Sequence, residues 1–210
     1  MVEDSGRGYW DRNASRYDRS MALLGGPLPP MAELVAEAVS GAERVLEVAA
    51  GTGLVTRVVA PRVKQLVATD YSAAMVSELQ ARVDRQAPGN VACEQADLYA
   101  LPYDAGSFDA VVAANVLHLV PYLDGALAAL SDMLRPGGRL VVPTYCHDEH
   151  AASWIMSRLL GLTGFPGQRR FTLATLEEAV RGAGLEVVER ELISGILPIG
   201  FVVAELPGGS

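Results

Sequence analysis

Residues 45–56, VLEVAAGTGLVT, constrain the fold more than any other part of this chain. An apolar strand runs into a turn that carries Gly51 and Gly53, and a helical segment follows. Glycine lets the backbone turn sharply and lets a ligand approach the main chain with no Cβ in the way. The new helix offers unpaired N–H groups and the positive end of its dipole to that ligand. The segment therefore predicts a ligand-binding loop at the carboxyl end of a buried strand.

The rest of the chain alternates between strand-like and helix-like segments. Short apolar runs typical of strands buried on both faces occur at 44–48, 65–69, 91–95, 108–113 and 138–143. Helical candidates occur at 54–63, 72–86, 123–134 and 151–162. Two more strand candidates, 185–191 and 196–205, flank Ser194-Gly195 and predict an antiparallel hairpin. We expect an α/β fold with a doubly wound, mostly parallel, seven-stranded Rossmann-like sheet.

We expect one domain over residues 1–210, because no repeat, low-complexity tract or linker divides the chain. Its parts are a helical cap (1–41), a cofactor-binding core (42–145), a substrate lid insertion (146–171), and a last helix with the hairpin (172–205). The cap holds two helical candidates, Tyr9–Leu24 and Met31–Val39, around the breaker GGPLPP. Whether residues 206–210 are native stays open.

Charge and apolar patterning narrow the partners. The formal net charge is −8, and we find no basic stripe of the kind that nucleic-acid binders usually show; a local basic patch stays open as an alternative. No apolar run approaches the roughly 20 residues that span a bilayer, and the polar, acidic start does not resemble a signal peptide. Cys93 and Cys146 lie far apart without metal-ligand spacing. We expect a cytoplasmic protein with a small-molecule substrate, no metal, no nucleic-acid partner and no stable membrane insertion. A homodimer stays open.

Two features of the glycine loop and one acid beyond it distinguish between ligands. Thr56 stands where a third glycine would complete G-x-G-x-x-G, which argues against a pyrophosphate and a nicotinamide-dependent oxidoreductase. Glu47 at the strand end would repel pyrophosphate but favour a ligand with ammonium and sulfonium groups. Asp70 ends the next strand, where a Rossmann-type fold places its ribose-binding acid. The alternative for Asp70 is a cap on the helix that starts near Ser72.

Four ordered segments extend this argument to a family. VLEVAAGTG, ATDYS, EQADLYALPYDAGSFDAVVAANVLHLV and LRPGGRLVV resemble the motif set of class I methyltransferases that depend on S-adenosylmethionine (SAM). The resemblance covers residues 45–143. Within the family, these motifs are similar to those of the branch that contains the quinone-biosynthesis C-methyltransferases. In LRPGG, Pro136 is expected to end a helix and Gly137-Gly138 to turn the chain into a strand at Arg139–Val142. The chain departs from the family at Ala49, where glycine is usual.

The resemblance implies SAM as the cofactor and assigns contacts to it. Asp70 would bind the ribose, Asp97 and the backbone of Leu98 the adenine, and Tyr71 would lie against the adenosine. The methionine end would contact the main chain of Ala49 and Gly51 and the carbonyl of Asn115. Tyr17 resembles the aromatic that many members fold over the cofactor, with packing in a helical core as the alternative. These join Glu47 and Gly53 as candidate cofactor-binding residues.

The three histidines of the chain fall in two loops that should follow the fourth and fifth strands. We select His118 and His147 as candidate catalytic residues, because an imidazole can take a proton from a hydroxyl, thiol or acidic carbon during methylation. His150 is a weaker candidate, and hydrogen bonding within the loops is the alternative for all three. Arg169 and Arg170 end the lid insertion and would meet an anionic group or solvent.

The sequence thus predicts an enzyme that transfers a methyl group from SAM to a small, apolar or aromatic molecule, with the acceptor atom (O, S, N or C) undetermined. An apolar lid would exclude water and suit such an acceptor. Three alternatives remain: a catalytically silent SAM-binding protein, a nicotinamide-dependent oxidoreductase, and an aminopropyl transferase, for which the loop NVLHLV lacks the extra acids.

Overall fold

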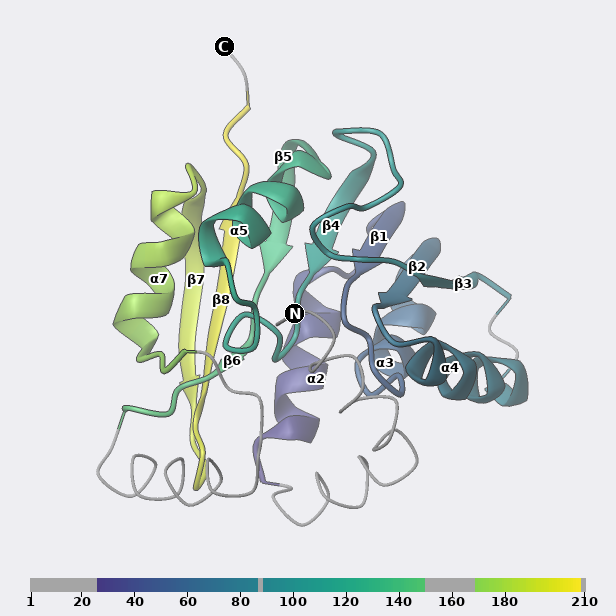
Figure 1. Cartoon of the computed structure of the whole chain (residues 1–210), viewed down its shortest axis with the longest axis horizontal. Coiled ribbons are helices and arrows are strands. Elements are labelled where there is room, and N and C mark those ends of the chain that lie inside the picture. Colours follow the sequence, from purple (N-terminus) through teal and green to yellow (C-terminus); the bar gives the residue numbers. More distant parts are fainter. Residues whose placement is uncertain (1–25, 87–88, 150–168, 209–210) are drawn as a thin grey trace.

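A computed structural model describes residues 26–86, 89–149 and 169–208, and its core is a twisted sheet (Figure 1). Five parallel strands stand in the order β3-β2-β1-β4-β5. Their bounds are β1 Arg44–Glu47, β2 Gln65–Asp70, β3 Val91–Gln95, β4 Phe108–Val112 and β5 Leu134–Val141. The order reverses between β1 and β4, which is the arrangement that opens a ligand crevice at the carboxyl ends of these strands.

The far side of the sheet is antiparallel. β8 (Ile199–Glu205) pairs with β5, and β7 (Glu186–Ile193) pairs with the other edge of β8. The hairpin predicted around Ser194-Gly195 is therefore confirmed. β6 (Thr144–Tyr145) follows β5 along the same edge of β8. This two-residue strand makes eight strands in the described part of the chain, where the sequence predicted seven.

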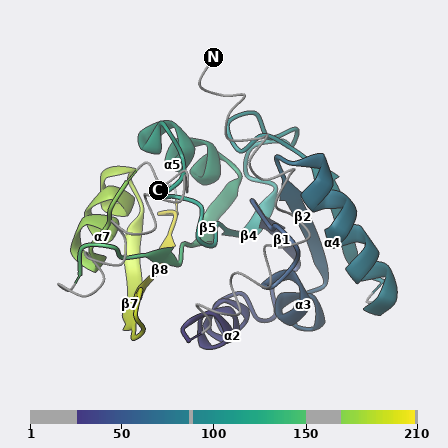
Figure 2. The ribbon, with the colours of Figure 1, turned by 60° about the horizontal axis from the view of Figure 1, so that its bottom comes forward.

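Helices cover both faces of the sheet (Figure 2). α2 (Leu28–Ala38) and α3 (Thr56–Val59) pack on one face, and α5 (Leu123–Asp132) and α7 (Leu173–Gly182) pack on the other. α4 (Ala73–Gln86) lies beside β2 and β3, where its Leu79 meets Ala68. β1 and β4 are almost entirely buried between these layers, as their continuous apolar runs predict.

Proline accounts for two differences from the expected helices. The helix expected over 54–63 is split into α3 and a 3-10 turn, η1 (Ala60–Arg62), because Pro61 lacks an N–H and would clash with the carbonyl four residues before it. The second cap helix, expected at Met31–Val39, begins at Leu28 instead of Met31. Pro29 and Pro30 fall in its first turn, where backbone N–H groups have no helical partner to lose.

The expectation for the LRPGG segment is wrong. α5 ends at Asp132, and β5 already begins at Leu134, so Pro136 ends no helix. The strand pairs with β4 at Leu134 and again at Arg139, and the residues between form an irregularity in the ladder. Gly137 takes a φ of 74° there and donates its N–H to the Leu206 carbonyl. Proline and glycine are tolerated in a strand at such a bulge.

Several expectations lie outside the described residues, namely the helices at 9–24 and 151–162, Tyr17 and His150. Among the helices that the structure describes, none has the length and apolar character needed to cross a bilayer.

Candidate functional site

The carboxyl ends of the parallel strands gather most of the described site residues. Glu47 ends β1 and Asp70 ends β2, Asp97 lies just beyond β3, and Asn115 lies just beyond β4. His147 follows β6 on the same side of the sheet. Because these strands run parallel, side chains at their carboxyl ends line one edge, as the sequence predicts.

The Asp70 carboxylate joins the ends of β1 and β2. Its Oδ2 accepts the backbone N–H of Gly51 at 2.8 Å, and its Oδ1 accepts that of Ser72 at 2.9 Å. The helix-capping role belongs to Ser72, whose hydroxyl accepts the N–H of Met75 at 3.2 Å. Asp70 therefore fixes the glycine loop in position, whether or not it also meets a ribose.

The two glycines of the loop serve different purposes. Gly51 and Gly53 have φ values of 57° and 89°, in the region that favours glycine. A Cβ on Gly53 would come within 2.6 Å of the Leu79 side chain, so Gly53 lets α4 pack closely. A Cβ on Gly51 would meet no described atom within 4 Å. Among the described residues, none covers the Gly51 main chain on the side where a Cβ would point, so a ligand could approach it there.

Ala49 also adopts a left-handed conformation, with a φ of 52°. A side chain with a Cβ is strained there, because the methyl group crowds the following carbonyl. The sequence marks Ala49 as a departure from the family's usual glycine, and the backbone gives the physical reason for that usual glycine.

Glu47 lies at the end of β1 with only 2% of its surface exposed. Its Oε2 accepts a hydrogen bond from the Thr56 hydroxyl at 2.7 Å, which ties β1 to the start of α3. Burial raises the pKa of Glu47 to about 8, so the carboxyl is mostly neutral at pH 7. A favourable charge toward a cationic ligand would thus require that binding ionise it.

The predicted adenine loop forms a tight turn after β3. Asp97 Oδ1 accepts the N–H of Tyr99 at 3.0 Å, and the Asp97 carbonyl accepts that of Ala100 at 2.9 Å. Leu98 is half-buried against the cluster that contains Leu117. Tyr71, half-buried at the end of β2, is tied to β3 through its carbonyl, which accepts the Gln95 side-chain amide at 3.0 Å. The predicted adenosine contacts therefore lie on connected loops.

Asn115 turns the chain after β4. Its φ is 51°, a conformation that asparagine tolerates better than most residues, and its N–H donates to the Pro143 carbonyl at 2.7 Å. The side-chain oxygen of Asn115 is buried and has no hydrogen-bond partner among the described residues. Such an atom inside a protein indicates a group that a ligand or water satisfies.

His118 and His147 lie together, as candidate catalytic residues should. Their ring centroids are 5.5 Å apart, and the Tyr145 ring lies 5.7 Å from His118 and 6.1 Å from His147. His118 is fully buried, and burial followed by the nearby His147 lowers its pKa to about 3. Burial, then the charge of Arg170, lowers the pKa of His147 as well. Both imidazoles are therefore neutral at pH 7.

Arg169 donates hydrogen bonds to three backbone carbonyls of the loop after β4. Its guanidinium donates to the carbonyls of Val120 at 2.8 Å and Pro121 at 3.4 Å, and its backbone N–H donates to the His118 carbonyl at 3.1 Å. It therefore holds the loop after β4. Arg170 lies 4.0 Å from Asp148 at the surface.

The two cysteines differ in their surroundings. Cys146 is fully buried and packs with Leu176 and Phe171 on the face opposite Tyr145, as expected of a small apolar side chain. Cys93 is only half-buried, because β3 is the edge strand and its faces are partly open.

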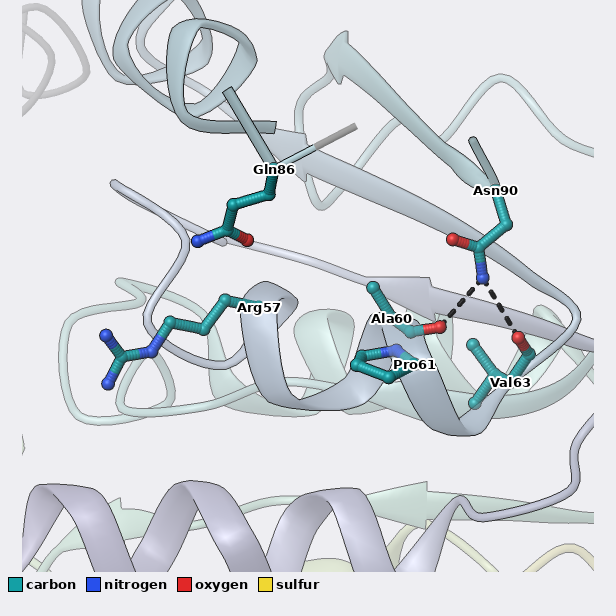
Figure 3. A pocket seen from close by; sticks show the side chains of 6 residues that line it. All are labelled: Arg57, Ala60, Pro61, Val63, Gln86 and Asn90. Carbon is teal, nitrogen blue, oxygen red and sulfur yellow. Dashed lines mark hydrogen bonds between the residues drawn. The ribbon is translucent and has the colours of Figure 1, made fainter. Parts of the chain in front are cut away.

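A hollow of about 430 Å³ lies near the amino ends of β2 and β3 (Figure 3). Its lining residues are Arg57, Ala60, Pro61, Val63, Gln86 and Asn90. The Asn90 side-chain amide donates to the carbonyls of Ala60 at 2.8 Å and Val63 at 2.9 Å, and so satisfies two backbone acceptors at η1. Since these residues precede β2 and β3, the hollow is separate from the candidate site.

Comparison with known proteins agrees with this arrangement. A methyltransferase domain family matches residues 46–142, which include the carboxyl ends of the five parallel strands β1 to β5. The ubiquinone/menaquinone biosynthesis C-methyltransferase UbiE of Pseudomonas savastanoi pv. phaseolicola is 36% identical over 137 residues, covering 61% of this chain and 53% of that protein. The chain thus spans about half the length of the curated relatives that it matches.

Solved structures show the same fold at lower identity. A chain from the complex between the Haloferax volcanii Trm112 methyltransferase activator and the putative methyltransferase matches with a TM-score of 0.80 at 19% identity, covering 97% of this chain and 98% of that one. The [4+2]-cyclase SpnF matches with a TM-score of 0.72 at 22% identity, covering 86% and 82%. The family match identifies residues 46–142 as a methyltransferase domain, similar in sequence to the quinone C-methyltransferases. Its fold is similar to that of solved structures from Aquifex aeolicus and Thermotoga maritima that are named as SAM-dependent methyltransferases.

Proposed function

We propose that this chain transfers the methyl group of SAM to a small, apolar or aromatic acceptor. The carboxyl edge of the sheet carries this proposal, because Asp70 holds the open Gly51 main chain in place and Asp97 forms the next turn along the edge. With it go the expectations of a cytoplasmic location and of a single domain with a cap (1–41) and a lid (146–171).

In this proposal Asp70 binds the ribose, and the Asp97 turn with Leu98 binds the adenine. Tyr71 and Tyr17 enclose the adenosine. Ala49, Gly51 and Asn115 hold the methionine end, with Glu47 and Gly53 shaping the loop. The buried Asn115 oxygen, unpaired among the described residues, supports a ligand at that end.

SAM supplies an electrophilic methyl group, so the chain mainly aligns the acceptor and excludes water. Where the acceptor must lose a proton, a neutral imidazole can accept it. His147 suits this role better than His118, because a group with a pKa of about 3 is too weak a base. Both remain candidate catalytic residues in this proposal, since the His118 ring lies 5.5 Å from that of His147.

A product screen tests this function. Purified protein is incubated with SAM and a panel of phenols, thiols, amines and activated carbon acids, and products are analysed by mass for the gain of one CH₂. For a hydroxyl, thiol or carbon acceptor, His147→Gln should lower kcat by about a hundredfold or more and leave SAM affinity unchanged. A protein that binds NADH but shows no calorimetric signal with SAM would overturn the proposal.

One neighbour favours a second candidate, a SAM-binding protein without methyl transfer. The solved structures of this fold include a protein named as a [4+2]-cyclase, so the fold does not by itself fix the reaction. SAM binding without S-adenosylhomocysteine release over the whole acceptor panel would support this candidate.

A further inference from the structure

The Tyr99 hydroxyl connects two loops that would contact opposite ends of the cofactor in the proposed site. It accepts the backbone N–H of Tyr122 at 3.1 Å and donates to the Tyr122 carbonyl at 3.0 Å. Tyr99 follows Asp97 and Leu98 directly, whereas Tyr122 ends the loop that begins at Asn115. A single side chain thus joins the loop after β3 to the loop after β4, although β2 and β1 stand between those strands.

Both partners of this bridge are held in place from their own sides. The Tyr99 backbone N–H is bonded to the Asp97 carboxylate at 3.0 Å. Tyr122 is the residue directly before α5, and its carbonyl accepts the Ala126 N–H. Its ring lies so close to Gly125 that a Cβ on Gly125 would come within 2.3 Å of the ring. Because both ends of this bridge are themselves held in place, the two hydrogen bonds fix the position of one loop relative to the other. Hydrogen bonds between two mobile groups would not do so.

We infer that Tyr99 is a positioning residue that sets the separation between the adenine contact and the methionine contact of the cofactor site. This inference rests on the proposed function. A ligand with an adenosine end and a methionine end binds best when both loops already stand at the matching separation. Burial raises the pKa of Tyr99, so the phenol keeps the proton that it donates to Tyr122.

A positioning role for Tyr99 predicts a result that simple stabilisation of the loops would not give. Of the two loops that the bridge joins, adenosine contacts only the loop after β3, whereas SAM contacts both. Loss of the bridge should therefore weaken SAM more than adenosine. A purely structural tyrosine would lower both affinities together, or lower the melting temperature without changing their ratio.

The test is Tyr99→Phe, measured by calorimetry with SAM and with adenosine. We expect a roughly three- to tenfold loss of SAM affinity, the usual effect of removing one neutral hydrogen-bonding group, and less than about a twofold loss for adenosine. Tyr122→Phe is the matched control, because Tyr122 enters the bridge through its backbone and the residue is 63% exposed. It should change neither affinity.

Equal losses for the two ligands, or unchanged SAM affinity in Tyr99→Phe, would overturn the inference while leaving the proposed function intact. Failure of the wild-type protein to bind SAM would instead reject the proposed function, and the inference with it. Thermal melting of each variant shows whether its fold is retained.

Discussion

Replacement of Ala49 by glycine should stabilise the protein, which is unusual for a substitution that removes a methyl group. At a φ of 52°, the Ala49 backbone carries strain of about 1–2 kcal/mol for a residue with a Cβ. Glycine removes this strain but gives the unfolded chain more freedom, which costs about 0.5–1 kcal/mol. The balance is a gain of up to about 1.5 kcal/mol, centred at ~0.75 kcal/mol, which corresponds to about 2–3 °C in melting temperature for a domain of this size.

Urea unfolding, with calorimetry as a second probe, measures this gain. Ala50→Gly is the matched control, since Ala50 is the next residue, is 9% exposed, and has no positive φ. Without strain to relieve, it should destabilise by about 1 kcal/mol or more through unfolded-state freedom and lost burial. If Ala49→Gly destabilised as much as Ala50→Gly, the Ala49 methyl would contribute more through packing than its backbone costs, and the strain argument would be wrong.

Three further predictions test the site and its supports. Asp70→Ala should weaken SAM binding by roughly 1.5–3 kcal/mol in calorimetry, and Asp97→Ala by less, because the backbone of Leu98 keeps its adenine contact; a larger loss at Asp97 would reverse this ranking. The raised pKa of Glu47, from 4.5 to about 8, means that the folded state binds the proton more tightly, so wild-type stability should fall between pH 5 and 8 relative to Glu47→Gln; parallel pH profiles would contradict this. Thr172→Ala should destabilise by about 1 kcal/mol in urea unfolding, since Thr172 caps α7, and an unchanged midpoint would show that the cap is dispensable.

Much of the fold follows from sequence because buried strands have a recognisable composition. The runs at 44–48, 65–69 and 108–113 became β1, β2 and β4 within a residue or two of each end. β6 was missed, since two residues have no periodicity. The LRPGG segment was misassigned because proline and glycine both end helices and interrupt strands, and only the β4 pairing tells these outcomes apart.

The sequence also predicts where the site lies, but not the protonation or the cross-links of its residues. His118 and His147 were selected from their place after strands, and they do lie together. Their neutrality comes from burial by distant segments, which no local pattern encodes. Tyr99 was missed for a similar reason. Its partner is a backbone group 23 residues away, and a hydroxyl that binds main chain leaves no residue-type signal at the partner.

The structure also changes the choice that the sequence posed at Asp70. A helix cap and a ribose contact are alternatives only if the carboxylate serves one partner, and a carboxylate has about four acceptor positions. Asp70 accepts two backbone N–H groups, one from the glycine loop and one from the turn before α4. These bonds hold the carboxylate and the Gly51 main chain in a fixed relation before any ligand arrives, which reduces the ordering that binding must impose. A loss of stability in Asp70→Ala would therefore be expected together with the loss of SAM affinity, and it would not argue against the ribose contact.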